Sequence, residues 1–248
     1  MNIHDRRKEE DYFAPRVLKE AARWLEENQD ADKLFLTVES FDPHEPFFSQ
    51  AEFQRLYPHE YDGPPFDWPP YRELREDQQT VEHIRYLYAS LVSFCDQQLG
   101  RVLDVFDEHD LWQDTLLLVN TDHGFLMGEH DWWAKVVTPF FQEVAHIPFW
   151  IHDPRAPECA NSKSQALAQT IDLAPTILDY FDIATPQDMQ GQRLLDALRG
   201  DNDNDNDDGK AMRKASLYGV MGGQVNVTDG RYVYMRGSAT DDNGPLFE

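Results

Sequence analysis

Two short segments carry side chains that could bind a cation or move a proton. Asp122 and His123 stand side by side before Gly124. A carboxylate and an imidazole at the end of a strand could both face one cation, and the glycine would let the backbone turn away without strain. The alternative is a turn in which Asp122 caps the next helix and His123 lies on the surface, because short motifs often occur by chance.

His44 stands in the second segment, between Pro43 and Pro46. Two prolines stiffen a loop and fix where the imidazole points, which suits a general acid or a substrate contact. The alternative is that His44 has only a structural role, as a lone histidine in a proline-rich loop usually does. The two segments therefore indicate a site only in combination.

The chain around these segments has the pattern of alternating helices and strands. Apolar residues at helical spacing predict amphipathic helices over residues 15–27 and 81–106. Short apolar runs predict buried strands at 34–40, 115–121 and 148–152. This alternation predicts an α/β fold with a mostly parallel sheet flanked by helices.

The expected strands explain how the site could form. His44 and the Asp122–His123 pair each follow a predicted strand. In open α/β sheets, ligands collect where loops leave the carboxyl ends of the strands. We therefore expect both segments to lie on the same rim of the sheet.

Two stretches outside these elements lead to further predictions. Residues 49–77 lack a sustained period and read as a long irregular loop that shapes the pocket. Its aromatic residues could stack on a sugar or aromatic ring, or could pack the loop down: Tyr57, Tyr61, Trp68 and Tyr71. Further on, Asp172 can cap a helix that runs toward Phe181.

The last part of the chain differs in character. Residues 201–208 form a low-complexity acidic tract, which predicts a solvated disordered loop. Beyond it, two strand-like runs broken by Asp229-Gly230 predict a small antiparallel sheet. We accordingly expect an α/β domain at 1–200, an acidic loop at 201–214 and a small antiparallel subdomain at 215–248.

The motifs together resemble a known family. Residues 121–153 resemble the signature of the type I sulfatases, which belong to the alkaline-phosphatase-like superfamily, and residues 35–47 resemble their Pro-His-x-Pro loop. The long helix before residue 115 and the run that begins Ile171-Asp172-Leu173 also resemble the family and stand in its order.

The resemblance implies roles for four residues. Asp122 and His123 match the family's ligands to a divalent cation, for which Ca²⁺ is expected first and Mg²⁺ or Mn²⁺ are alternatives. Lys135 matches the lysine that binds a sulfate oxygen beside the leaving group. His44 matches the histidine that faces the scissile ester, and it could supply the proton of the leaving group.

The resemblance also implies parts that these residues do not include. The family's nucleophile is a formylglycine made from Cys or Ser in a Cys/Ser-x-Pro-x-Arg motif, and neither Cys95 nor Cys159 stands in one. We expect the nucleophile, a second lysine and the paired aspartates of the metal site in an N-terminal part that precedes this sequence. A sheet without its first strands would expose an edge, which predicts an oligomer or a companion chain.

The composition excludes some classes of function. With 22 Lys and Arg against 46 Asp and Glu, the net charge is −24. Such a surface repels phosphate, so we expect no nucleic-acid partner. No apolar run is long enough for a membrane helix and residues 1–11 lack the core of a signal peptide, so the chain reads as cytoplasmic as written, although an export signal could belong to the N-terminal part.

Three functions remain open at this stage. The first is a metal-dependent sulfatase-type hydrolase that acts on a sulfate monoester of a small molecule or sugar. The second keeps the fold but acts on a phosphodiester or phosphonate. The third is a non-catalytic sulfatase-like remnant that serves as a binding module.

Overall fold

The structure is a computed structural model that describes residues 8–136, 139–200, 212–220 and 223–237. It divides into two compact units. The first comprises Met1–Gln113 and Phe125–Thr138, and the second comprises Asp114–Gly124 and Pro139–Glu248. The chain therefore passes from the first unit to the second, back to the first, and again to the second.

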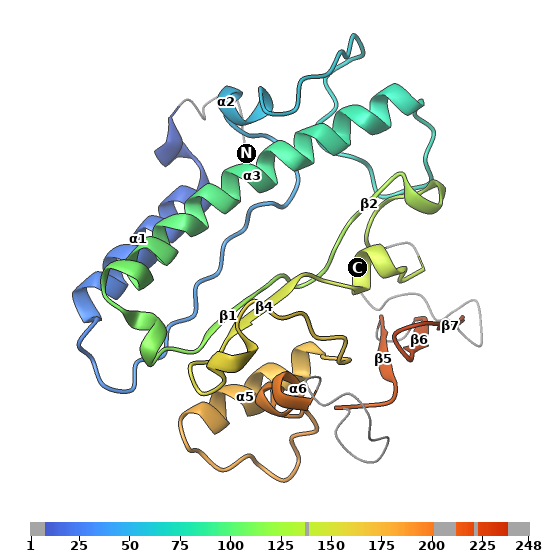
Figure 1. The fold of residues 1–248 in the computed structure, drawn as a ribbon. Coiled ribbons are helices and arrows are strands. Elements are labelled where there is room, and N and C mark those ends of the chain that lie inside the picture. Colours follow the sequence, from blue (N-terminus) through green and yellow to red (C-terminus); the bar gives the residue numbers. More distant parts are fainter. Residues whose placement is uncertain (1–7, 137–138, 201–211, 221–222, 238–248) are drawn as a thin grey trace. The chain divides into compact units, whose positions relative to one another are not determined.

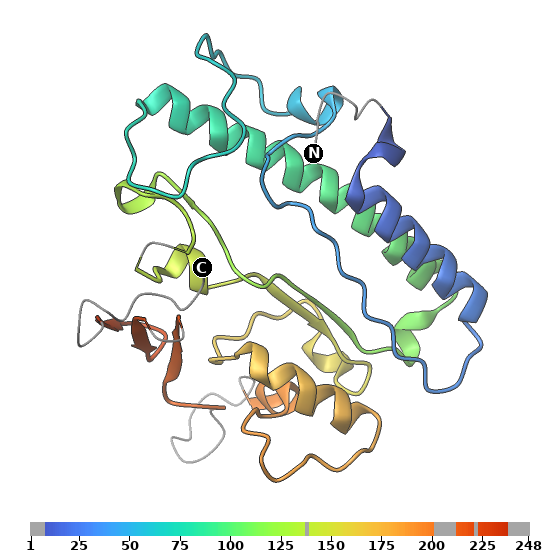
Figure 2. The ribbon, with the colours of Figure 1, turned by 180° about the vertical axis from the view of Figure 1, so that it is seen from behind.

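Two helices dominate the first unit. Helix α1 covers Phe13–Asn28 and helix α3 covers Gln78–Glu108, and they pack along one another (Figures 1 and 2). The carboxylate of Asp77 accepts a hydrogen bond from the backbone N–H of Thr80 at 2.9 Å, so α3 begins with a side-chain cap. Both predicted helices are confirmed, each extended at its ends.

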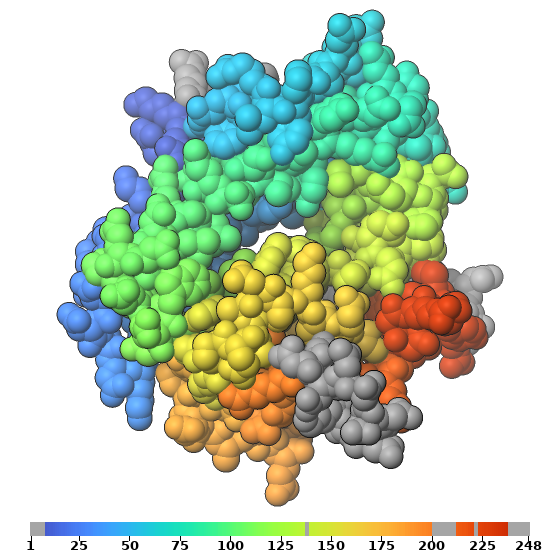
Figure 3. All heavy atoms as spheres, in the orientation of Figure 1, coloured from blue at the N-terminus to red at the C-terminus, as the bar shows by residue number. Residues whose placement is uncertain are grey.

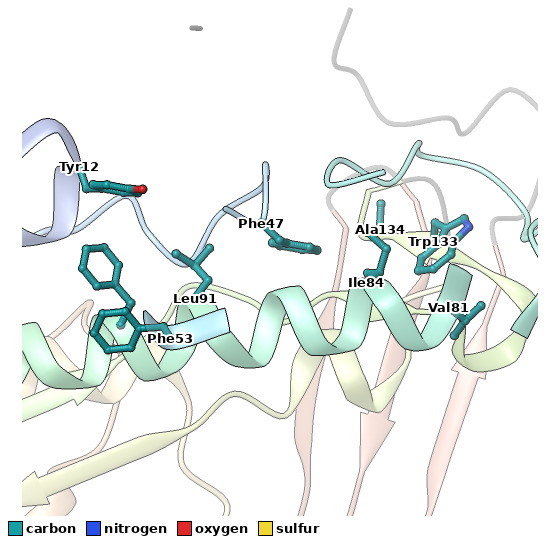
Figure 4. Packing of buried hydrophobic residues seen from close by; sticks show 9 residues of the cluster. Tyr12, Phe47, Phe53, Val81, Ile84, Leu91, Trp133 and Ala134 are labelled. Carbon is teal, nitrogen blue, oxygen red and sulfur yellow. The ribbon is translucent and has the colours of Figure 1, made fainter. Parts of the chain in front are cut away.

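The core of this unit follows the apolar face of α3. Figure 4 shows buried side chains of α3 along the helix, with Tyr12, Phe47 and Trp133 above them. Each large apolar side chain that is fully buried contributes roughly 1.5–3 kcal/mol to stability. The cluster consists of Tyr12, Phe47, Phe53, Val81, Ile84, Leu91, Phe94, Trp133 and Ala134.

Short elements complete the first unit. Strands β2 (Leu126–Met127) and β3 (Trp133–Ala134) form an antiparallel pair. The remaining elements are η2 (Glu9–Asp11), α2 (Ala51–Gln54), η3 (Leu111–Gln113) and η4 (Glu129–Asp131). In the space-filling view of Figure 3, the blue atoms of α1 lie against the green atoms of α3.

The predicted strand at residues 34–40 is wrong. This segment has no regular secondary structure and joins no β-ladder among the described residues. Its side chains Phe35 and Val38 are 62% and 38% exposed. A strand requires a neighbour that pairs with its backbone groups, and an apolar run carries no information about that neighbour.

The second unit contains a β-pair and two main helices. Strand β1 (Leu117–Asn120) pairs with β4 (Phe149–His152), and the helices are α5 (Leu173–Tyr180) and α6 (Leu194–Gly200). The pair β1–β4 is antiparallel, as is every strand pair of the described residues, so the prediction of a mostly parallel pairing is wrong here. Apolar runs mark strands but do not fix their direction. The short elements are α4 (Gln142–Ala145), η5 (Pro157–Cys159) and η6 (Thr170–Asp172).

Asp172 has a different role from the predicted helix cap. Helix α5 does follow it and ends before Phe181, but the carboxylate makes no capping hydrogen bond to this helix. It accepts instead from the backbone N–H groups of Gln169 and Gln192 and from both terminal nitrogens of Arg213, at 2.5–2.8 Å. Burial alone would raise the pKa of Asp172, but these hydrogen bonds outweigh it and hold the pKa below its usual value.

The end of the described chain is a small antiparallel sheet, as predicted. Its strands are β5 (Ser216–Gly219), β6 (Val225–Thr228) and β7 (Val233–Arg236), paired in that order. The carboxylate of Asp229 accepts from the N–H groups of Arg231 and Tyr232, and Gly230 takes a φ of 87°, so this turn needs both residues. The acidic tract predicted to be disordered lies outside the described residues.

A search of the described residues finds no helix with the length and apolarity required to span a membrane.

Candidate functional site

The loop that carries His44 is fixed to the helix pair. The carboxylate of Asp42 is buried and accepts from the N–H of Ala14, at the start of α1, at 3.0 Å. The peptide bonds that precede Pro43 and Pro46 are both cis. The aromatic ring of Phe41 stacks on the imidazole of His44, with ring centroids 4.4 Å apart. These contacts hold the imidazole in one place.

His44 is partly open to solvent on one side and bonded on the other. Its side chain is 31% exposed. The Nδ1 atom lies 2.8 Å from the backbone oxygen of Glu45 and 3.2 Å from the carboxylate oxygen Oε2 of the same residue. A histidine held this way can present its other nitrogen to a ligand.

Lys135 is held by the turn that precedes it. Strand β3 ends at Ala134, which is fully buried and takes a φ of 73°, a conformation that side chains other than glycine seldom adopt. Such backbone strain tends to occur at functional sites. Arg85 on α3 anchors the preceding turn by donating to Glu129 at 2.8 Å and to the backbone oxygen of Met127 at 3.0 Å.

Glu45 brings His44 and Lys135 together. The ammonium of Lys135 lies 3.6 Å from Oε2 of Glu45 and 5.8 Å from the centre of the Phe125 ring, and its side chain is only 9% exposed. The other carboxylate oxygen of Glu45 accepts a short hydrogen bond from the hydroxyl of Tyr71. The first unit therefore gathers two predicted site residues around one buried carboxylate.

Glu45 and Tyr71 are functional candidates that the sequence reasoning missed. Glu45 stands between His44 and Pro46, so its place in the loop was an available signal. Tyr71 was considered only for ring stacking. Burial, and then the bonded carboxylate of Glu45, raise the pKa of Tyr71 above its usual value, so its hydroxyl stays a donor.

Tyr57 and Tyr61 pack the 49–77 loop against α3, whereas Trp68 does not. The hydroxyl oxygen of Tyr57 lies 2.7 Å from the hydroxyl oxygen of Ser93 on α3, at hydrogen-bond distance. The ring of Tyr61 stacks on the imidazole of His83 on the same helix, with ring centroids 3.8 Å apart. Trp68 is 56% exposed. Of the four residues considered for ring stacking, Trp68 is thus the one whose ring is most open to a ligand.

Asp122 and His123 lie just after β1 in the second unit. Oδ2 of Asp122 and Nε2 of His123 are 3.3 Å apart, and the Asp122 side chain is 81% exposed. Nδ1 of His123 lies 3.0 Å from the backbone oxygen of Gly124. Because a carbonyl can only accept, Nδ1 carries the proton and Nε2 of the neutral ring keeps its lone pair.

This pair fits one part of a metal site. A lone pair on Nε2 and a carboxylate oxygen that face each other at 3.3 Å repel unless a cation or proton lies between them. Histidines that bind metals commonly donate their other N–H to a backbone carbonyl, as His123 does. Among the described residues, however, no three His, Cys, Asp or Glu side chains form a cluster that could hold a metal ion. Asp122 and His123 could thus supply at most two of the ligands that such a site needs.

Gly124 is required by close packing. Its N–H donates to the backbone oxygen of Val144 at 2.8 Å, and a Cβ added here would lie 1.9 Å from the backbone oxygen of Glu143. The sequence predicts a glycine that relieves strain in a turn. Its actual role is to let the loop after β1 approach the backbone of α4.

The two halves of the predicted site belong to different units. His44 and Lys135 are in the first unit, and Asp122 and His123 are in the second. Their convergence on one rim stays a prediction.

Neither cysteine has the features of a nucleophile. Burial on α3, and secondarily the charge of Asp42, raise the pKa of the Cys95 thiol to about 12, so the reactive thiolate is disfavoured. Cys159 is buried in η5 and its Sγ donates to the backbone oxygen of Leu198 at 3.3 Å. This agrees with the interpretation of Cys95 as a structural thiol.

Several known proteins are similar to this chain. Human iduronate 2-sulfatase is 30% identical over 195 residues, which are 68% of this chain and 34% of that protein. The crystal structure of phosphonate monoester hydrolase of Agrobacterium radiobacter matches 90% of this chain and 52% of its own, with a TM-score of 0.71 and 20% identity.

A third relative was solved in complex with its substrate, D-glucosamine-2-N,6-O-disulfate. The match covers 67% of this chain and 35% of the chain of that relative, with a TM-score of 0.55 and 24% identity. These likenesses show an alkaline-phosphatase-like α/β fold. The chain spans about a third of the length of the human relative.

The family model for sulfatases matches residues 2–183, which include all four predicted site residues. The chain belongs to the sulfatase family.

Proposed function

We propose that this chain forms the leaving-group side of a hydrolase that acts on sulfate monoesters. His44 and Lys135 would bind the ester, and Asp122 and His123 would contribute two ligands to a divalent cation, with Ca²⁺ the first candidate. The observation that carries the proposal is the placement of His44 and Lys135 against the same buried carboxylate, within 3.2 and 3.6 Å of Oε2 of Glu45.

The chemistry of sulfate ester hydrolysis matches these groups. As the bond between sulfur and the ester oxygen breaks, negative charge grows on the departing oxygen. Lys135 is a nearly buried ammonium, and a fixed cation in a site of low dielectric stabilises that charge more than it would in water. His44 would donate a proton to the departing oxygen, so that it leaves as an alcohol. A bound cation would add Lewis-acid stabilisation of the sulfate oxygens.

The nucleophile and the rest of the metal site are assigned to a segment with the Cys/Ser-x-Pro-x-Arg motif. The first check is therefore the genomic DNA before the codon for Met1. An in-frame motif of this kind would support the proposal. A stop codon with no such motif before it would favour the non-catalytic remnant.

We further propose that the substrate is a sulfated sugar. Support comes from the relative whose solved complex contains a disulfated glucosamine, and from Trp68, whose exposed ring could stack on a sugar. The net charge of −24 repels a sulfated ligand at long range, so attraction would come from the local cations. A second copy or a companion chain against residues 34–40 remains part of the proposal.

The decisive test is release of inorganic sulfate by the protein purified from its own host and expressed from its own gene. Purification in this form keeps any adjoining segment or partner chain that supplies the nucleophile. We expect turnover of a sulfated glucosamine that Lys135→Ala reduces at least a hundredfold, while the exposed control Lys163→Ala leaves it unchanged. Equal turnover in both variants would contradict the proposal.

The same assay separates the alternative activity. A phosphonate monoester and a phosphate diester are offered beside the sulfate ester at equal concentration. The proposal requires the largest kcat/KM for the sulfate ester. A preference for either phosphorus ester would assign the site to the alternative hydrolase.

A further inference from the structure

Glu45 carries a buried oxygen whose bonding is incomplete. The residue is 2% exposed, and its Oε1 atom accepts from the hydroxyl of Tyr71. Its Oε2 atom is buried and, among the described residues, has no hydrogen-bond partner of good geometry. A buried carboxylate oxygen left this way lowers stability, so stability alone gives no reason for a glutamate here.

What faces Oε2 is positive or can become so. Nδ1 of His44 lies at 3.2 Å and the ammonium of Lys135 at 3.6 Å, and both belong to the pair that we assign to ester binding. These are ion-pair distances. The partly exposed imidazole and the nearly buried ammonium are thus held near a negative charge that solvent barely screens.

The same contacts fix the protonation pattern of the imidazole. Nδ1 of His44 has two oxygens within 3.2 Å, the backbone oxygen and Oε2 of Glu45. A carbonyl and an ionised carboxylate can only accept, so Nδ1 must carry a proton. The lone pair of the neutral ring is then on Nε2.

We propose that Glu45 is the positioning residue of the site: its backbone oxygen holds His44 with Nδ1 protonated, and its buried carboxylate, anchored by Tyr71, keeps the Lys135 ammonium beside the imidazole. Nε2 of His44 is accordingly the atom that delivers the proton to the departing ester oxygen. This inference rests on the proposed function, because His44 and Lys135 are its ester-binding pair.

A purely structural carboxylate would be arranged differently. Replacing a buried ion pair by apolar residues of the same volume is often neutral or stabilising, so such pairs are weak evidence for a stabilising role. Glu45 instead places one oxygen on a tyrosine and the other between two groups that can be cationic. The arrangement costs stability but orients the donor and the cation.

The first experiment determines the tautomer of His44 without any turnover. Long-range ¹⁵N–¹H correlation spectra of the histidine-labelled full chain are recorded at a pH where the ring is neutral, and His44→Asn identifies its signals. We expect a protonated Nδ1 and a bare Nε2. A neutral ring with its proton on Nε2 would overturn the assignment.

The second experiment compares Glu45→Gln with Glu73→Gln in the protein purified from its host. Glu73 is exposed, so the control removes the same charge from a nearby surface position. We expect kcat for 4-nitrophenyl sulfate to fall at least tenfold in Glu45→Gln, with KM changed less than about threefold. Glu73→Gln should keep the kcat of the unaltered protein.

Measurement of the folded fraction by circular dichroism distinguishes positioning from loss of folded protein. The kcat per folded molecule should still fall at least tenfold in Glu45→Gln. A kcat per folded molecule equal to that of the unaltered protein would mean a structural role and would overturn the proposal.

The two proposals fail separately. If no form of the protein releases sulfate, the proposed function fails, while a neutral His44 ring with its proton on Nε2 would still overturn the positioning role of Glu45. If sulfate is released but Glu45→Gln keeps full kcat, the function stands and the positioning role is wrong.

Discussion

The ammonium of Lys135 lies 3.6 Å from Oε2 of Glu45, and both side chains are buried. The two residues are far apart in sequence. The helix pair α1–α3 supports the loop that carries the glutamate, and the turn before β3 supports the lysine. The stability of each buried charge thus depends on the presence of the other, and this coupling can be measured.

The first prediction is an energetic coupling between these two residues. Lys135→Met leaves the carboxylate buried beside fewer charges, so it should lower the free energy of unfolding by about 3 kcal/mol. The double variant Lys135→Met/Glu45→Gln should be less destabilised than the sum of the two single variants, by about 1 kcal/mol or more. Urea unfolding measures all three, with Lys163→Met as the exposed control. Strict additivity would show that the two charges do not interact.

The second prediction is a dependence of stability on pH that comes from Glu76. Burial alone would raise its pKa, but hydrogen bonds from Arg72 at 2.5 Å and from the indole of Trp133 at 2.8 Å lower the pKa to about 2. A carboxylate whose pKa is lower in the folded state stabilises the fold above its unfolded pKa of 4.5. This contribution, on the order of 3 kcal/mol, is lost as the pH falls toward 2.

Glu76→Gln tests this dependence. At neutral pH the variant should unfold more easily than the unaltered chain, and the difference should shrink as the pH falls from about 4.5 toward 2. The exposed Glu60→Gln should show no such change. Tryptophan fluorescence follows unfolding. If the free energies of unfolding of Glu76→Gln and the unaltered chain differed by the same amount at neutral pH and at pH 2, Glu76 would not be the source of the pH dependence.

The third prediction contrasts two glycines. In Gly124→Ala the new Cβ would lie 1.9 Å from the backbone oxygen of Glu143, so the backbone must shift, at a cost of about 2 kcal/mol or more. In Gly100→Ala, inside α3, the Cβ meets nothing within 4 Å, so the variant should be up to about 1 kcal/mol more stable. Thermal unfolding of the two variants should therefore shift in opposite directions, and a shift in the same direction would refute the packing role of Gly124.

The fourth prediction concerns the cation. Ca²⁺ that binds the folded chain should raise the unfolding temperature, and EDTA should reverse the effect. Asp122→Asn should remove most of this stabilisation, whereas the exposed Asp188→Asn should keep it. Mg²⁺ and Mn²⁺ are compared at the same concentration. Equal stabilisation of both variants would exclude Asp122 as a ligand.

The sequence predicted the parts of the fold that rest on local periodicity. Helices α1 and α3 were predicted because their apolar residues recur at helical spacing over several turns, and the β6–β7 turn because Asp229-Gly230 has a clear local signature. The prediction of strand pairing failed because pairing depends on partners that an apolar run does not specify. Residues 34–40 were predicted to form a buried strand, yet they join no ladder in the described part of the chain.

The candidate site was predictable to a similar extent. His44, Asp122, His123 and Lys135 stand in motifs that could be read directly. Glu45 was visible in the same loop, but its role depends on Tyr71 and Lys135, which are distant in sequence and meet it only after folding. A contact between distant residues leaves no periodic pattern in a single sequence.

The most direct test of the central claim is whether His44 and Asp122 face the same ligand. Mn²⁺ is paramagnetic and broadens the NMR signals of nearby protons, so it is added to the full chain while the ring protons of His44 are observed, with Asp122→Asn as the control. The account predicts that Mn²⁺ broadens the His44 signals in the unaltered chain and that Asp122→Asn abolishes the effect. His44 signals that stay sharp while Mn²⁺ binds at Asp122 would contradict it.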